Sequence, residues 1–497
     1  FDANKPEIKG SVVFKKNNEI KDKELGDTSK CLDQGLVPLT RRDLSKEIPQ
    51  DPYVSEFITH WIDMCTEIRK RDTDLGDRCD TILKKISSAE ILANVEIDDL
   101  DLGGITDLFE TLNTAGTRVS AIDIVHANLI DHFEGTKKSQ FLLRDWIDDL
   151  CQDSISRGWG KQSRREIIAQ LVVSTDLAAD RRRPAKIGSD SPQSVKNKDI
   201  LNLSHDHWED IIDREDEFKL AINAFQESVL DYQFPQDDCP YPISAGIYVG
   251  LWWHREFDKV TWASNRLDRL FRAFFWRNVL LQRYDQGFLT QMVADIRELK
   301  KFLKESASIG DGSWVTDANT FLDQLFAADG SLPSVKMIAE HYQGSPPRGA
   351  LGNALRLPIK YRTQLDILEP SQQVTYPNQE EVQLHHIFPK KWIKKNPKSL
   401  GTWYGKKGNM NLQDAPNSLA NLTPLTGDSN KKWNDDSPSK TIAGLSPQQQ
   451  QHTHRIWVDR FIDYDALKDL TSDSAKDFIE RRALNIADWV CDQTKVV

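Results

Sequence analysis

Apolar residues recur at intervals of three and four positions along most of this chain. Between residues 54 and 68, for example, Phe57, Trp61 and Cys65 stand one helical turn apart and predict an amphipathic helix. The same spacing predicts helices over residues 141–151, 166–177, 208–232, 260–284, 448–462 and 474–491. We therefore expect a mainly α, multidomain protein with a small β content, which places it in the α+β class.

Short alternating apolar runs predict only a few strands. Residues 10–14 and 91–97 fit this pattern in the first hundred positions. Residues 383–389 and 419–425 fit it near the other end, with a lysine-rich loop between them. These four runs account for the β content that we expect.

The two later runs frame a group of polar side chains. His385 and His386 lie in the first run, which Pro389 closes, and a Gly427-Asp428 turn follows the second. Ser429 can cap a short helix that carries Asn430. The order strand, loop, strand, helix predicts a small unit folded round one metal ion.

A helix stop and a helix start lie close together near residue 115. A helix that ends at residue 112 meets Asn113, Thr114 and Gly116, and Ser120 with Asp123 resembles a capping box. The local pattern favours two helices packed around a turn. The alternative is that Asn113, Thr114 and Gly116 line a nucleotide pocket, because glycine and hydroxyl residues at a helix start suit phosphate.

Two further patterns have a structural and a functional interpretation. Aromatic and arginine residues alternate over residues 251–255 and 271–278, which suits base stacking but is more typical of a helical core with arginine stems packed over it. The histidines of residues 205–207 and 452–454 are spaced for a metal. No third ligand accompanies either pair, so we expect both pairs on the surface.

Composition narrows the class of protein. Apolar residues make up 39% and charged residues 28%, as in soluble proteins, and no run approaches the eighteen or so apolar residues of a membrane span. The six cysteines form no C-x-x-C pair, which favours a reducing cytoplasm. The chain begins with Phe1 and shows no signal segment, so we expect it to be part of a longer protein.

Charge is distributed unevenly. The net charge of −11 argues against a protein that coats nucleic acid. Between Glu381 and Asp414, however, there is no acidic residue, while lysines crowd the loop beside the histidines. We expect DNA-backbone contacts from Lys390, Lys391, Lys394, Lys395, Lys406 and Lys407.

The histidine motif resembles the HNH nuclease motif in its ββα-metal form. His385-His-Ile-Phe-Pro389 is followed by Asn421 and, nine positions later, by Asn430. The resemblance implies that His385 and Asn430 hold Mg²⁺ or Mn²⁺, that His386 is the general base and that Asn421 orients it. His385 stands where many HNH sites have an acidic residue.

The rest of the chain resembles GmrSD-type proteins, in which a ParB-like nucleotide-hydrolysing domain precedes an HNH domain. The matching segments are residues 108–120, residues 274–284 with Asp295-Ile296, residues 417–425, and Ser437-Pro-Ser439. The resemblance implies a ParB-like α/β remnant, a helical middle and an HNH domain. We place them at residues 1–135, 136–345 and 346–497, with the last boundary at the linker candidate Gly344-Ser-Pro-Pro-Arg-Gly349. The family's D-G-Q-Q-R nucleotide motif is absent from this sequence.

The resemblance implies a metal-dependent DNA endonuclease of a restriction or phage-defence system. Such an enzyme acts on foreign or modified DNA and is regulated by a nucleoside triphosphate. Two alternatives stay open: a DNA- or nucleotide-binding regulator with an inactive HNH remnant, and a nuclease that acts on RNA. The sequence does not decide whether the chain forms a homo-oligomer.

Overall fold

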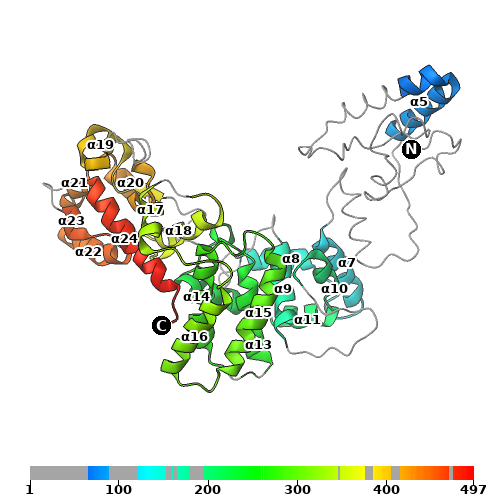
Figure 1. The fold of residues 1–497 in the computed structure, drawn as a ribbon, viewed down its shortest axis with the longest axis horizontal. Coiled ribbons are helices and arrows are strands. Elements are labelled where there is room, and N and C mark those ends of the chain that lie inside the picture. Colours follow the sequence, from blue (N-terminus) through cyan, green and yellow to red (C-terminus); the bar gives the residue numbers. More distant parts are fainter. Residues whose placement is uncertain are drawn as a thin grey trace. The chain divides into compact units, whose positions relative to one another are not determined.

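The computed structural model describes residues 65–88, 120–152, 159, 165–179, 194–258, 260, 262–344, 347–374, 384–403, 415–468 and 474–497 (Figure 1). The chain divides into two compact units, Phe1–Asp99 and Leu100–Val497, and each is described by itself. Several predicted features lie outside the described residues. They are the strands over residues 10–14 and 91–97, the loop residues Asn113, Thr114 and Gly116, and the lysines Lys406 and Lys407.

In the first unit, the described residues form two consecutive helices. Residues 65–71 are helical, in agreement with the predicted spacing, and α5 follows as Thr73–Ser88. The helices lie very close, because a Cβ atom on Gly76 would stand 2.7 Å from the Arg69 Cα. The Nε of Arg69 donates to an Asp77 carboxylate oxygen at 2.7 Å, which joins the two helices on their exposed side.

The second unit opens with a long series of helices, of which the apolar spacing predicts α8, α9, α14 and, as one helix, α11 with α12. The series is α7 (Ala121–Phe133), α8 (Leu143–Gln152), α9 (Glu166–Ala178), α10 (Asn197–Asn202), α11 (His205–Asp213), α12 (Glu215–Leu230), α13 (Ser244–Phe257), α14 (Ser264–Leu280), α15 (Phe288–Glu305) and α16 (Asp311–Leu325). The capping box at the start of α7 is confirmed, since the Ser120 amide donates to Asp123 at 2.8 Å.

One predicted helix is two. The helix expected over residues 208–232 breaks at Arg214, whose φ of −118° and ψ of 41° are not helical. The Arg214 guanidinium lies over the Phe257 ring, 4.5 Å from its centroid, so this side chain packs on α13 at the point where the chain changes direction. Arg214 and Phe257 are 43 residues apart in the sequence. The spacing of apolar residues around position 214 therefore does not predict this break.

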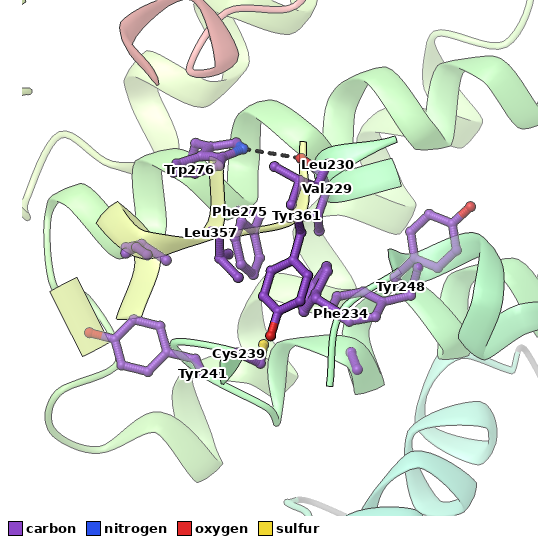
Figure 2. Close-up of a cluster of buried hydrophobic side chains, with 14 of the residues drawn as sticks. Val229, Leu230, Phe234, Cys239, Tyr241, Tyr248, Phe275, Trp276, Leu357 and Tyr361 are labelled. Carbon is purple, nitrogen blue, oxygen red and sulfur yellow. Dashed lines mark hydrogen bonds between the residues drawn. The ribbon is translucent and has the colours of Figure 1, made fainter. Parts of the chain in front are cut away.

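Aromatic side chains fill the core of the helical region (Figure 2). Phe275 and Trp276 are fully buried, and the Trp276 Nε1 donates to the Val229 carbonyl oxygen at 3.3 Å. The interpretation of the aromatic and arginine pattern as core is therefore confirmed. Helices α9 and α13 approach closely at Gly250, where a Cβ atom would lie 2.5 Å from the Ser174 carbonyl oxygen.

The later part of this unit combines short helices with a small sheet. Its elements are α17 (Val335–Gln343), α18 (Gly349–Tyr361), β1 (Leu384–His386), α19 (Lys390–Lys395), η4 (Pro397–Trp403), η5 (Ala415–Asn417), η6 (Leu419–Asn421), β2 (Leu422–Pro424), α20 (Gly427–Trp433), α21 (Pro438–Ala443), α22 (Pro447–Asp459), α23 (Tyr464–Lys468) and α24 (Ala475–Gln493). Across the described ranges, the one sheet is the antiparallel pair β1 and β2. The expectation of a mainly helical chain is confirmed.

Packing continues across residue 345. Buried apolar side chains from Ala121 to Val496 form one cluster, and the Arg277 Nε on α14 donates to the Thr494 carbonyl oxygen at 2.8 Å. The domain boundaries near residues 135 and 345 stay predictions. None of the helices in the described ranges combines the length and the apolar character that crossing a bilayer needs.

Two buried arginines close the outer edge of β2. The Asn421 carbonyl points toward β1, because it accepts from the Ile387 amide at 2.8 Å. Carbonyl directions alternate along a strand, so the carbonyls of Ala420, Leu422 and Pro424 point away from β1. Arg482 on α24 donates to the carbonyls of Ala420 and Leu422 at 2.8 and 2.7 Å. Arg460 donates to the Pro424 carbonyl at 3.2 Å, and the two guanidinium groups thus occupy the place of a third strand.

The two arginines also donate to backbone carbonyls outside β2. Arg482 donates to the Arg460 carbonyl at 3.3 Å, and Arg460 reaches the Leu365 carbonyl at 2.5 Å. Burial lowers the pKa of each guanidinium to about 9, which still leaves both charged at neutral pH. Several carbonyl dipoles offset the cost of burying these charges.

Replacing Arg482 with Met should lower the free energy of unfolding by about 3 kcal/mol, because three backbone carbonyls lose a charged donor in a buried setting. The change is measured as a shift of the urea unfolding midpoint. Arg481→Met is the matched control, since the Arg481 side chain is 58% exposed on the same helix. Equal midpoints for the two variants would show that β2 does not depend on this edge.

Candidate functional site

The histidine pair lies on a two-stranded sheet that is followed by a short helix. In β1, His385 is in register with Thr423 and His386 with Leu422. Helix α20 begins three residues after β2. The predicted order of strand, strand and helix is confirmed.

Two predicted boundaries in this unit are wrong. Residues Leu419–Asn421 form a 3-10 turn, so the second strand begins at Leu422 instead of 419. Thr426 caps α20 in place of Ser429, because the Thr426 hydroxyl accepts from the Ser429 amide at 3.2 Å. Ser429 is buried inside the helix, where its hydroxyl has a different partner.

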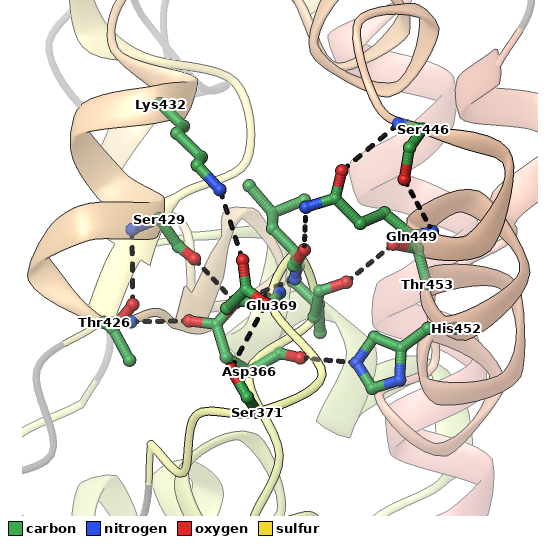
Figure 3. Close-up of polar contacts among 12 residues, drawn as sticks. Asp366, Glu369, Ser371, Thr426, Ser429, Lys432, Ser446, Gln449, His452 and Thr453 are labelled. Atoms are coloured by element: carbon green, nitrogen blue, oxygen red, sulfur yellow. Dashed lines mark hydrogen bonds and ion pairs between the residues drawn. The ribbon is translucent and has the colours of Figure 1, made fainter.

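That partner is Asp366, which is fully buried (Figure 3). Its carboxylate accepts from the Ser429 hydroxyl at 2.7 Å and from the Thr426 amide at 2.8 Å. The amides of Leu368 and Glu369 donate to the same carboxylate at 2.8 and 3.1 Å. Four donors therefore occupy this carboxylate, which ties the start of α20 to the segment before β1.

The backbone of Asp366 and Ile367 is also hydrogen-bonded to side chains of α22. The His452 Nε2 lies 2.9 Å from the Asp366 carbonyl oxygen, and the Thr453 hydroxyl donates to Ile367 at 2.7 Å. The expectation that both spaced histidine pairs lie on the surface is thus wrong in part. His452 is half-buried in this network, and His207 is buried with its Nε2 2.8 Å from the Thr175 hydroxyl. Both bind neighbouring polar groups of the fold.

Both site histidines are half-buried. Burial lowers the pKa of His385 below its ordinary value, and the negative charge of Asp366 opposes that change. Burial also lowers the pKa of His386, and the nearby charge of Lys390 lowers it further. A hydrogen bond with the Asn417 side chain acts in the opposite direction. Both rings are neutral at neutral pH, as a metal ligand and a general base require.

Asn421 is buried, and its side chain binds backbone. Its Oδ1 accepts from the Phe388 amide at 2.8 Å, and its Nδ2 donates to the Phe388 carbonyl at 3.0 Å. The same Nδ2 donates to the Pro416 carbonyl at 3.1 Å. Asn421 therefore holds the chain two residues beyond His386 and joins it to the turn before β2.

Asn430 is exposed on α20, and its amide donates to the Thr426 carbonyl at 2.9 Å. Thr423 pairs with His385 across the sheet, and Asn430 comes seven residues after Thr423 in the chain. The unit thus brings the elements that carry His385, His386, Asn421 and Asn430 together. Their assignment as ligands and base stays a prediction.

The fit to a metal ion rests on few donors. No group of three or more His, Cys, Asp or Glu side chains in the described part of the chain is placed to hold one. Asp366, the carboxylate whose charge reaches His385, is fully engaged by other donors. One imidazole and one amide fit Mg²⁺ or Mn²⁺ only as a partial set, which water and phosphate oxygens complete.

The described lysines of the predicted DNA-binding set lie on α19. Lys390, Lys391, Lys394 and Lys395 are exposed, and Lys391 forms an ion pair with Asp435 at 3.0 Å. This pair places the end of α20 beside α19. The basic helix therefore borders the histidine site.

Sequence reasoning missed two kinds of residue. Asn417, whose hydrogen bond raises the pKa of His386, lies in the turn η5, which has no clear sequence signal. Arg460 and Arg482 act over long separations, and their only signal is an arginine on the apolar face of a predicted helix. Comparison of the chain with protein-family models and with curated proteins gave no match.

Replacing Asn421 with Ala should lower the free energy of unfolding by about 3 kcal/mol, because the buried amide and carbonyl of Phe388 lose their partner. Asn430→Ala, an exposed change in the same unit, should leave it within about 0.5 kcal/mol of wild type. Chemical unfolding monitored by circular dichroism measures both. An Asn421→Ala variant as stable as Asn430→Ala would contradict the role of Asn421 in the fold.

Proposed function

We propose that this chain is a metal-dependent DNA endonuclease of the HNH type. The observation that supports the proposal most directly is the β1–β2–α20 unit, in which His385 and His386 share one short strand and Asn430 lies on the helix that follows. The basic helix α19 beside this unit supplies charge for a phosphate backbone.

In the proposed reaction, His386 accepts a proton from the water that attacks phosphorus. The bond from phosphorus to the water oxygen forms, the bond to the 3′ oxygen breaks, and the leaving oxygen takes a proton from solvent. Asn421 keeps the backbone next to the base in place. His385 and Asn430 would hold Mg²⁺ or Mn²⁺, which supplies positive charge beside the phosphate when bound.

The resemblance to GmrSD-type proteins extends the proposal to the biological role. A restriction or phage-defence enzyme of the cytoplasm would cut foreign or modified DNA under control of its N-terminal region. A nucleoside triphosphate bound near Asn113, Thr114 and Gly116 would regulate cutting. Cleavage of plain, glucosylated and phosphorothioated plasmids, with and without nucleotide, tests this biological role. Equal cleavage of the three plasmids would contradict the recognition of modified DNA.

His386→Ala should reduce nicking of supercoiled plasmid in Mg²⁺ or Mn²⁺ by at least about 100-fold, the loss expected when a general base is removed. The control is His341→Ala, an exposed histidine on α17, which should nick as well as wild type. Agarose gels that separate supercoiled from nicked plasmid give the rates.

Three outcomes would count against the proposal. Wild-type protein that gives no nicked product would favour a regulator with an inactive site. Equal rates for His386→Ala and wild type would show that the activity belongs elsewhere. Preferential digestion of an RNA over a DNA of the same sequence would identify a nuclease that acts on RNA.

Replacing Lys394 and Lys395 together with Ala should weaken DNA binding and reduce the slope of log affinity against log salt concentration by about two, since each phosphate contact contributes about 0.9. The matched control replaces Lys301 and Lys336, which are exposed on α15 and α17. Fluorescence anisotropy over a salt series measures both slopes. Equal slopes for the two double variants would exclude α19 as the DNA contact.

A further inference from the structure

We propose that Cys65 and Cys79 form a reversible disulfide that locks two helices of the first unit together. Cys65 lies on the helix of residues 65–71, and Cys79 lies on α5. Neither cysteine belongs to the proposed nuclease site, and the cross-link needs neither metal nor DNA. The apolar spacing of the sequence accounts for Cys65 only as a buried position of a helix.

The chain reverses direction between the two cysteines. A single residue separates the helix of residues 65–71 from α5. The two backbones come very close at Gly76, where a Cβ atom would stand 2.7 Å from the Arg69 Cα. Cys65 is about one helical turn from Arg69, and Cys79 is about one turn from Gly76. Both cysteines therefore lie next to the closest approach of the two helices.

The two thiols are in direct contact. The Cys65 thiol donates to the Cys79 sulfur, and the two Sγ atoms lie 3.5 Å apart. The sulfur atoms of a disulfide are about 2.05 Å apart, so bond formation needs an approach of about 1.5 Å. Small changes in the side-chain torsions of the two cysteines suffice for this approach, because the backbones that carry them are already close.

The surroundings of the pair keep it reduced while the helices are together. Cys65 and Cys79 are both buried, which limits access of an oxidant. The hydrogen bond with Cys65 raises the pKa of the Cys79 thiol, and burial raises it further. The thiolate is the form that attacks a disulfide, so the closed pair reacts slowly. Oxidation therefore begins when the two helices separate briefly, and their closure brings the second thiol into place.

The reaction balances with a low-molecular-weight disulfide such as oxidised glutathione. The thiolate of one cysteine attacks a glutathione sulfur, the bond between the two glutathione sulfurs breaks, and one glutathione thiolate leaves. The thiolate of the other cysteine then attacks the protein sulfur of this mixed disulfide and expels the second glutathione thiolate. The two protein thiols thus give up two electrons and two protons, which the two glutathione molecules take up. Reduced glutathione reverses both steps.

The first measurement identifies the cross-link in the whole chain after treatment with oxidised glutathione. Trypsin places Cys65 in the peptide of residues 47–69 and Cys79 in that of residues 79–84, so the disulfide joins two separate peptides. Mass spectrometry without reduction should find this joined peptide at least about tenfold more abundant than any other cysteine pair, because its second step is intramolecular. Reduced glutathione should remove it.

Variants test which cysteines take part. Cys65→Ala and Cys79→Ala should each abolish the joined peptide. Cys151→Ala is the matched control, a half-buried cysteine of the second unit, and should leave the joined peptide unchanged. Wild-type protein in concentrated urea gives a reference that needs no variant to fold. There, the six cysteines should pair in several combinations, because the contact between Cys65 and Cys79 is lost.

Hydrogen exchange measures the effect of the cross-link on the fold. The two cysteines stand 14 positions apart, so the disulfide closes a short loop and restricts separation of the two helices. The amides of α5 should exchange at least about tenfold more slowly in the cross-linked protein than in the reduced protein. The amides of α9, in the second unit, should exchange equally in both forms.

Three results would overturn the proposal. Native protein that forms no joined peptide, under conditions in which unfolded protein forms disulfides, would show that the two thiols only pack as apolar side chains. A main product that joins either cysteine to Cys31 would place the reactive pair elsewhere. Equal exchange of the α5 amides in the two forms would show that the bond locks nothing. All of these measurements are made without DNA, so they stand whether or not the protein proves to be a nuclease.

Discussion

Two buried guanidinium groups on the outer edge of β2 are the interaction on which the site depends. A two-stranded sheet with three residues in each strand is too small to be stable by itself. Arg482 and Arg460 supply donors to the carbonyls that a third strand would otherwise pair. Because β2 is held on both edges, its pairing with β1 is fixed, with His386 opposite Leu422. Two like charges in the protein interior are costly, and the carbonyls of several segments offset that cost.

Buried and accessible polar side chains have different roles in this arrangement. Buried polar side chains bind backbone: Asp366 holds the start of α20, and Asn421 holds the chain after the histidines. His386 is half-buried and Asn430 is exposed, so the side chains to which we assign a chemical role in the proposal are more accessible than these two. Such a scaffold fixes the positions of a few reactive groups without placing them on mobile loops. It also explains why polar residues that take no part in the proposed reaction are among the most buried in the unit.

Local sequence patterns predicted what depends on local structure. Helical spacing identified α9, α14 and α24 to within a few residues, and Ser120 with Asp123 identified the start of α7. The order of β1, β2 and α20 was also predicted, because strand and turn residues alternate there. The failures involve distant partners. Arg214 breaks a helix where it packs on Phe257, and Ser429 is buried against Asp366 instead of capping α20.

The same reasoning explains why the candidate site was only half visible in the sequence. His385, His386, Asn421 and Asn430 stand at recognisable intervals, whereas Asn417 lies in a 3-10 turn that local spacing does not predict. His207 shows the opposite error. Its pair with His205 has no third ligand and was therefore expected on the surface, but His207 lies on the buried face of α11 against Thr175 on α9. Spacing describes one helix at a time and does not show which face meets a neighbour.

The separation between Arg482 and the carbonyls it binds has a consequence for synthesis on the ribosome. Leu422 in β2 stands sixty residues before Arg482 in the chain, so β2 emerges well before the donor of its outer edge. During that interval, the nascent chain holds every residue of the histidine motif but lacks the donor that closes its outer edge. The motif therefore becomes an ordered unit only when α24 has been translated and has packed, so incomplete chains carry His385 and His386 without the closed outer edge of β2.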